Sequence, residues 1–225
     1  MRRRLLFLLG CAILAPATAR AQDLADYDYT NLAFRGAGLT YGVIWPAKVQ
    51  STPTYGIRVD LGYMGPGVRI APSLTYWSSS FRDSELERFA DRLNRLPALE
   101  RQGAQITAAD LKPMKWSDLA LELDAHYVWT TPVGLLTYVG GGVGVHVLNG
   151  QGEAIQDTFI EDLLDSVSAG LSAIGGVEYP VSDRFRLYGE LRLAGLSDVQ
   201  YAGLRIGGAL MAPGRTEVSS RRGKQ

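Results

Sequence analysis

Short segments in which apolar and polar side chains alternate recur along most of this chain, and they constrain its fold more than any other feature. In the segment 54–64 the apolar face consists of Tyr55, Ile57, Val59, Leu61 and Tyr63. Alternation with a period of two is typical of a β-strand whose two faces meet different environments. The pattern is also clear in 116–130 and 184–196, and it is weaker in 34–45, 68–79, 135–148, 168–179 and 200–211. The sequence therefore predicts an all-β chain of about eight strands.

The connections between these segments alternate in length. Residues 65–67, 131–134 and 180–183 are rich in Pro, Gly and Asp, which indicates tight turns. The links between them are mostly longer, and they lie at 46–53, 81–115, 149–166 and, as a short one, 197–198. Short periplasmic turns that alternate with longer extracellular loops are typical of transmembrane β-barrels. We therefore expect an antiparallel up-and-down barrel over 34–211, with both of its ends on the periplasmic side.

Two of the long loops carry a helical pattern. Leu86, Phe89, Ala90 and Leu93 follow the spacing of one helix face within 83–93. The segment 157–167 has the same spacing through Phe159, Ile160, Leu163 and Leu164. We expect a short amphipathic helix in each loop, which either caps the barrel mouth or binds a partner.

Alternation alone does not decide which face of the wall is outside, because a soluble lipocalin-like barrel alternates too, with its apolar side chains inside. Aromatic side chains near the ends of the apolar faces favour a membrane barrel, in which they form girdles at the two interfaces. This predicted aromatic girdle consists of Tyr41, Tyr55, Tyr63, Tyr76, Tyr127, Trp129 and Tyr179. Lysine is also scarce in the strands, although edge strands of soluble sheets often use it for protection.

The polar faces carry acids and arginines in balanced numbers. Arginine is suited to buried bidentate pairs with carboxylates, and single buried charges would be prohibitive. We therefore predict that these side chains pair inside a narrow lumen. This lumen charge network comprises Arg58, Asp60, Arg69, Asp118, Glu122, Asp124, His126, Glu178, Arg184, Arg186, Glu190, Arg192 and Arg205.

The first residues have the composition of a secretory leader. A basic start at 2–4, a short apolar run and an A-x-A site at 19–21 predict a signal peptide over 1–21. Cys11, the single cysteine, lies within it and superficially resembles a lipoprotein cleavage box, but apolar residues would then follow the modified cysteine. We expect an N-terminal periplasmic segment at 22–33 and a disordered periplasmic tail at 212–225. Removal of the arginine-bearing leader leaves a mildly acidic chain, which argues against a nucleic-acid partner.

Few residues offer chemistry. A hydrolase would need a serine, a histidine and a carboxylate together. His126 and His146 both fall on the predicted lumen face, with no serine beside them, so we expect hydrogen-bonding roles and no enzyme activity. The acids of 157–165 lack the EF-hand spacing, and the glycines of 140–144 lack a dinucleotide-binding pattern. We expect no metal and no cofactor.

The leader, the alternating segments, the aromatic residues and the loop pattern resemble the small eight-stranded outer-membrane barrels of the OmpA/OmpX type. The resemblance implies a place in the bacterial outer membrane, contact with the lipid bilayer and lipopolysaccharide, and insertion by the barrel-assembly machinery. It also implies a non-enzymatic structural or surface-interaction role, with loops 81–115 and 149–166 facing outside. One departure is that the last strand ends near Leu210 and Met211, whereas an aromatic residue is usual there.

Three other functions remain open at this point. A small OmpW-like barrel could bind or transport apolar molecules, and would need a gap in the wall or an apolar pocket in the lumen. A barrel enzyme could modify lipid A, and a soluble lipocalin-like carrier could hold a ligand in an apolar interior.

Overall fold

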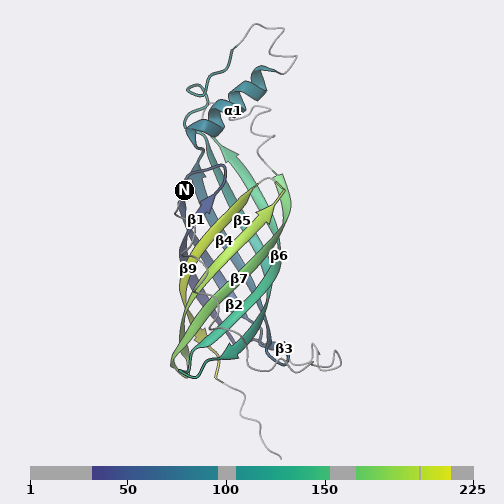
Figure 1. Ribbon diagram of the computed structural model, residues 1–225, viewed down its shortest axis with the longest axis vertical. Coiled ribbons are helices and arrows are strands. Elements are labelled where there is room, and N and C mark those ends of the chain that lie inside the picture. Colours follow the sequence, from purple (N-terminus) through teal and green to yellow (C-terminus); the bar gives the residue numbers. More distant parts are fainter. Residues whose placement is uncertain (1–31, 96–104, 153–165, 198, 214–225) are drawn as a thin grey trace, which may run out of the picture.

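The computed structural model describes residues 32–95, 105–152, 166–197 and 199–213, and its strands wrap into a closed barrel (Figure 1). The strands are β1 (Gly36–Pro46), β2 (Thr52–Asp60), β3 (Tyr63–Gly65), β4 (Val68–Ser80), β5 (Lys115–Thr130), β6 (Leu136–Gln151), β7 (Ser166–Ser182), β8 (Phe185–Leu196) and β9 (Gln200–Met211). The one helix among these residues is α1 (Asp83–Asn94).

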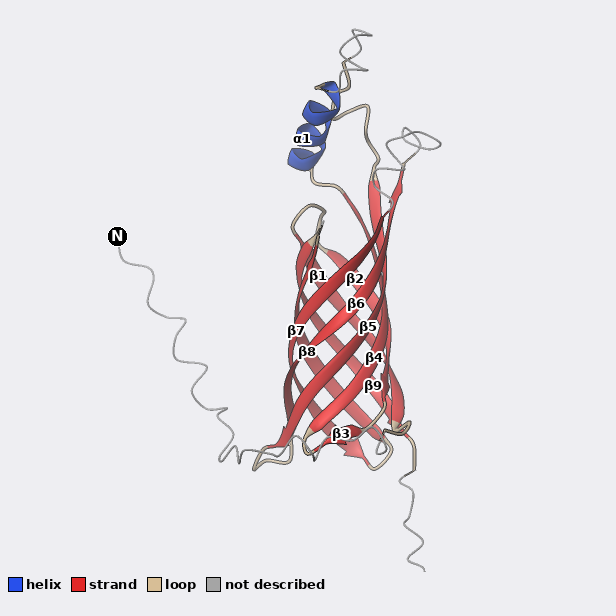
Figure 2. Cartoon of the chain, turned by 90° about the vertical axis from the view of Figure 1, so that its right-hand side faces the viewer, coloured by secondary structure: helices blue, strands red, loops and turns tan. Residues whose placement is uncertain are grey.

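Every pairing in the wall is antiparallel, and the pairing of β1 with β9 closes it. β2 and β3 both pair with β4, so together they form a single wall strand. The wall therefore has eight strands, as predicted, and its closure leaves no free sheet edge (Figure 2).

The predicted strand 54–64 is interrupted near its lower end. Gly62 adopts a positive φ of 79°, a conformation that glycine takes at little cost. The Asp60 carboxylate accepts a hydrogen bond of 2.8 Å from the Gly62 amide and stabilises this bend. The wall strand is therefore divided into β2 and β3.

The predicted turn at 180–183 was placed too early. Pro180 belongs to β7, and the turn consists of Asp183 and Arg184. The register of β7 against β8 shifts between Pro180 and Ser182. Such an irregularity near a strand end is a position that tolerates proline, so Pro180 marks a bulge and not the turn.

Helix α1 confirms the helix predicted at 83–93. Leu86, Ala90 and Leu93 are its buried residues, acidic side chains lie in its first turn, and Arg92 lies in its last. These charges match the helix dipole. The second predicted helix, 157–167, falls largely outside the described residues, but Ser166 and Val167 begin β7 and are not helical.

Helix α1 stands beyond the rim at the end of the barrel where the long loops lie (Figures 1 and 2). Its sequence is too polar and too short for a membrane span, and no helix in the described ranges reaches the length and hydropathy that a span requires. The predicted leader lies outside the described residues, and so do the predicted segment 22–33 and the predicted tail 212–225, except for residues 32–33 and 212–213.

Candidate functional site

The two surfaces of the barrel wall differ in polarity. On β5, Asp118, Glu122 and Asp124 are buried inside the barrel, whereas the leucines between them are 45 to 61% exposed on the outer surface. β2, β4, β7, β8 and β9 repeat this arrangement, with apolar side chains outside and charged side chains inside. A soluble barrel would have the opposite arrangement, because exposed apolar surface of this extent is unfavourable in water. The chain is a transmembrane β-barrel.

Arg192 on β8 holds one half of the lumen charge network together. Its guanidinium lies 2.6 Å from the Glu122 carboxylate and 2.5 Å from that of Asp124, both on β5 across the lumen. Its Nε lies 3.3 Å from Glu190 on its own strand. The Arg192 side chain is only 1% exposed, so these ion pairs are shielded from water and the attraction within them is stronger.

Glu178 on β7 is the centre of the other half. It accepts hydrogen bonds from Arg58 on β2 at 2.5 Å and from Arg69 on β4 at 2.9 Å. The Tyr138 hydroxyl accepts a hydrogen bond from Arg58 and donates one to Glu190. Because Glu190 also contacts Arg192, the two halves form one continuous set of alternating charges across the barrel.

Glycines on β6 make room for this network. A side chain at Gly144 would place its Cβ 2.9 Å from the Glu122 Cγ, and one at Gly142 would clash with the Asp124 carboxylate. Both glycines face the lumen, between Tyr138 and His146. The glycines therefore make the wall thin at β6, directly beside the large charged side chains of the neighbouring strand β5.

Three members of the predicted network lie at its edge or outside it. Asp60 and Arg186 lie at its lower edge, where they approach Arg69 at 3.8 Å and Glu178 at 3.7 Å. The Arg186 side chain is 27% exposed. Arg184 is exposed in the β7–β8 turn, so its placement in the network was wrong. The strand begins only at Phe185, and the alternation that turns Arg186 and Arg192 inward does not extend to a turn residue.

The remaining members are buried but less fully paired. Arg205 approaches Glu122 at 3.8 Å, and its Nε and Nη2 atoms have no hydrogen-bond partner among the described residues. His126 stacks on Tyr138 with ring centroids 4.7 Å apart and contacts Arg69. His146, which the prediction placed only on the lumen face, lies 2.9 Å from Asp118. Asp118 also accepts a hydrogen bond from the Trp77 indole.

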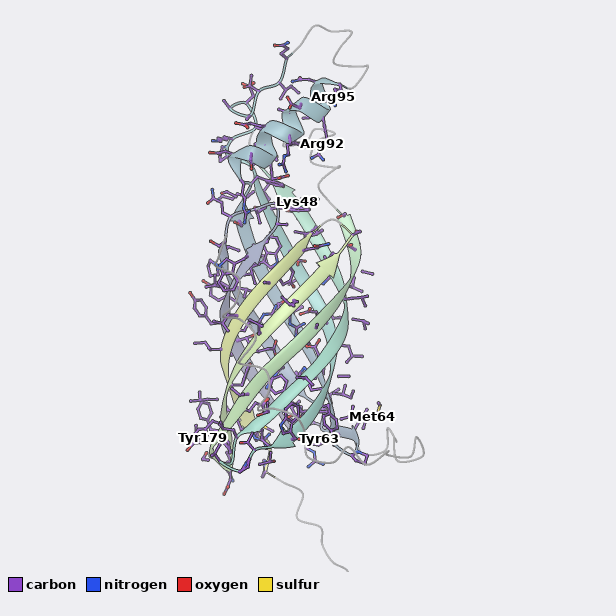
Figure 3. The ribbon with its side chains drawn as sticks, in the orientation of Figure 1. Lys48, Tyr63, Met64, Arg92, Arg95 and Tyr179 are labelled. Atoms are coloured by element: carbon purple, nitrogen blue, oxygen red, sulfur yellow. The ribbon has the colours of Figure 1, made fainter. Side chains whose placement is uncertain are left out.

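All seven residues of the predicted aromatic girdle face outward, but they do not form two matching girdles. Tyr63 and Tyr179 lie at the turn end of the barrel (Figure 3). Tyr127 and Trp129 lie near the β5–β6 turn, with rings 6.1 Å apart. These four fit one interface.

Tyr41, Tyr55 and Tyr76 lie side by side on β1, β2 and β4. Tyr41 lies midway along its strand, so this row stands within the apolar wall and not at its upper border. The position of an aromatic residue within its segment did not reveal its height along the barrel axis, because the stagger between tilted strands decides that height.

The loop end carries a second, apolar core. Ile44, Trp77, Leu148 and Tyr201 point inward at the upper end of the strands and join a cluster that includes Phe81, Trp116 and the buried face of α1. Phe81 and Trp116 stack at 5.5 Å. This cluster was not predicted, although the apolar inward positions at the strand ends were its signal.

Two loops are fastened to each other at this end. Arg82 donates hydrogen bonds to the carbonyls of Pro46 and Val49, each at 2.9 Å. Val49 also forms a β-bridge with Phe81. Beyond α1, Asn94 exchanges two hydrogen bonds with the Ile106 backbone, so the described part of the long loop folds back on the helix.

A turn at 107–110 continues this loop. The Thr107 hydroxyl and amide donate hydrogen bonds to the Asp110 carboxylate and lower its pKa. Lys112 pairs with Asp83 at the start of α1, at 2.7 Å. In the described ranges, no three His, Cys, Asp or Glu side chains gather as a metal site would require.

No protein-family model matches the chain, and no curated protein does. Among solved structures, Neisserial surface protein A is similar with a TM-score of 0.48 and 15% identity, over 80% of this chain and 96% of that one. Ail, the attachment invasion locus protein of Yersinia pestis, has a TM-score of 0.47 and 9% identity, over 80% and 97%. The outer membrane protein AlkL has a TM-score of 0.48 and 10% identity, over 87% and 96%. These likenesses extend to the general architecture only.

Proposed function

We propose that this chain is a non-enzymatic barrel of the bacterial outer membrane, with a structural role or a surface interaction made by its long loops, 81–115 and 149–166. The observation that carries the proposal is the pairing of charges across the lumen, from Arg58 and Glu178 to Arg192 and Asp124. Because paired side chains fill the lumen, this observation supports a function that is carried by the outer wall and the loops.

The distribution of structure between the two ends supports outward-facing loops. Tight turns close one end, whereas the other carries α1, the fastened loops and exposed cations such as Arg92 and Arg95 (Figure 3). Transmembrane barrels generally place the elaborate end outside the cell.

We further propose lipopolysaccharide and the lipid bilayer as partners, with insertion by the barrel-assembly machinery. Lys115 is exposed at the upper end of β5, and Lys48 lies over the Trp116 ring at 5.6 Å. Cations at this height, above the apolar wall, suit the phosphates of lipopolysaccharide.

The geometry of the histidines favours a barrel without catalysis over a lipid A enzyme. His126 and His146 are buried in the lumen, on the face of the wall that lipid does not contact. Among the described residues, their polar partners are Arg69 and Asp118 and not a serine hydroxyl. The same filled lumen argues against the transport of apolar molecules through the barrel.

The proposed orientation can be tested by cysteine labelling, because the single cysteine, Cys11, lies in the predicted leader. Ser84→Cys places a thiol on α1, and Asp183→Cys places one in a tight turn. We expect a membrane-impermeant maleimide to label Ser84→Cys in intact cells, and Asp183→Cys only after permeabilisation. The unsubstituted chain serves as the unlabelled control.

The opposite labelling pattern would place the loops in the periplasm and end the surface-interaction proposal. Heat-modifiability of each variant on a gel checks folding, because a folded barrel shifts in mobility when boiled. Activity on lipopolysaccharide that His126→Ala abolishes would contradict the non-enzymatic role.

A further inference from the structure

The outer surface of the wall has hollows within its apolar region, and one of them lies near the turn end. A groove of about 720 Å³ lies over β7, β8, β9 and β1, within the range of about 300–1,000 Å³ that is usual for ligand sites. Its lining includes Leu39, Tyr41, Val177, Tyr179, Leu187 and Ile206.

A missing side chain explains the hollow. Gly189 faces outward on β8, between Val177 of β7 and Ile206 of β9, which are its register partners. A Cβ at this position would meet no atom within 4 Å. The branched neighbours therefore surround an open space, which we call the Gly189 groove.

The groove extends from the turn end toward the middle of the wall. Tyr179 lies at the turn end (Figure 3) and pairs in register with Leu187. At the other end, the rings of Tyr41 and Tyr55 lie 5.4 Å apart. The groove is thus long, lined by apolar and aromatic side chains, and open toward lipid.

A cation lies in the turn that joins β7 to β8, between Tyr179 and Leu187 of the groove lining. Arg184 is exposed in the β7–β8 turn, three residues before Leu187 along the chain. Within the described residues, no carboxylate forms an ion pair with it, whereas the buried Arg58, Arg69 and Arg192 all have such partners. An apolar groove with an arginine at the membrane boundary matches an acyl chain that ends in a phosphate.

We propose that the Gly189 groove holds one acyl chain of a membrane phospholipid, with the lipid phosphate on Arg184. The apolar lining of the groove favours a hydrocarbon chain. The charge of Arg184 favours a lipid that bears a phosphate over a neutral lipid. The inference concerns the outer wall and is independent of what the loops bind.

Native mass spectrometry of the full chain, folded in detergent and mixed with phosphatidylglycerol, tests the proposal. We expect one phosphatidylglycerol to stay bound at collision energies that strip the others. Gly189→Leu fills the groove and should raise the dissociation constant for this lipid about tenfold, a change equal to about 1.4 kcal/mol.

Gly195→Leu is the matched control. Gly195 lies on the same strand and face but lines a separate hollow of about 640 Å³ nearer the loop end, so this variant fills a hollow of the wall outside the Gly189 groove. This variant should retain the lipid. Val177→Trp fills the groove from the neighbouring strand and should repeat the effect of Gly189→Leu, so that the test holds if one variant fails to fold.

Arg184→Gln tests the phosphate contact. Diacylglycerol has the same chains without the phosphate, and this variant should bind phosphatidylglycerol no better than diacylglycerol. Equal lipid retention by Gly189→Leu and Gly195→Leu, both with a normal heat shift, would overturn the proposal. A dimer that Gly189→Leu abolishes would also overturn it, because a second copy of the chain would then occupy the groove.

Discussion

Arg192 shows how single residues stabilise the interior. Its guanidinium contacts Glu122, Asp124 and Glu190, which lie on two strands at opposite sides of the lumen. Each carboxylate would be strongly unfavourable in this buried place without a cation. One guanidinium therefore contacts three of the carboxylates that are buried inside the barrel.

Replacement of Arg192 by leucine should destabilise the barrel severely. Loss of one partner of a buried ion pair costs about 3–5 kcal/mol, since it leaves uncompensated charge. The temperature at which the heat-modified form appears on a gel should fall clearly. Arg88→Gln removes an ion pair on the exposed side of α1 and should change that temperature little. Equal effects of the two substitutions would contradict the role assigned to Arg192.

A bulky residue at Gly142 on β6 should disturb the contact between Arg192 and Asp124. Gly142→Val places its side chain against the Asp124 carboxylate. Overpacking of this kind costs about 1–3 kcal/mol. Gly175→Val is a suitable comparison, because the nearest atom to a Cβ there is 4.0 Å away. Urea unfolding followed by tryptophan fluorescence should give a lower midpoint for Gly142→Val than for Gly175→Val.

Among the elements, the loops at the α1 end depend on a few hydrogen bonds. The apolar face of α1 packs in the cluster above the lumen, while Arg82 fastens the loop at 47–51 to the start of the helix. Connections of this length generally open more readily than strands, because they bury fewer apolar side chains. A change in Arg82 should therefore loosen the loops and leave the wall intact.

Arg82→Ala should increase cleavage in the loop 47–51 and near Phe81 by proteinase K added to folded protein. The carbonyls of Pro46 and Val49 would lose their donor, so the two loops would separate more often. Arg95→Ala, an exposed change at the end of α1, should keep the original cleavage pattern. Unchanged cleavage in Arg82→Ala would show that the apolar cluster alone holds the loops.

At the scale of the whole molecule, the lumen has two layers. Ile44, Trp77, Leu148 and Tyr201 fill the end near α1, and the charge network fills the middle and the turn end. Both layers consist of side chains that contact one another across the barrel. An eight-stranded barrel is only wide enough for such side chains to fill.

The barrel should therefore not conduct ions steadily. Protein folded into planar bilayers should give no sustained current under conditions in which an open porin conducts. A steady, voltage-independent conductance would mean that water passes the ion pairs, and it would favour the transport alternative.

Much of the wall could be predicted from the sequence, because the cause is local. Side chains of a strand alternate between two faces whatever the strand pairs with, so the outward leucines and inward acids of 116–130 were readable. The turn at 65–67 and helix α1 also follow from local composition and spacing. Charge balance indicated which face was inside, because unpaired charges cannot be buried.

The tertiary structure alone decided which residues meet. Arg58 and Glu178 are separated by 120 positions along the chain, and only barrel closure brings them within 2.5 Å. The exclusion of Arg184, the mid-wall height of Tyr41 and the hollow at Gly189 depend on the start of each strand and on its stagger against its neighbours. Those quantities are set by pairing around the whole barrel, whereas alternation is set within each strand.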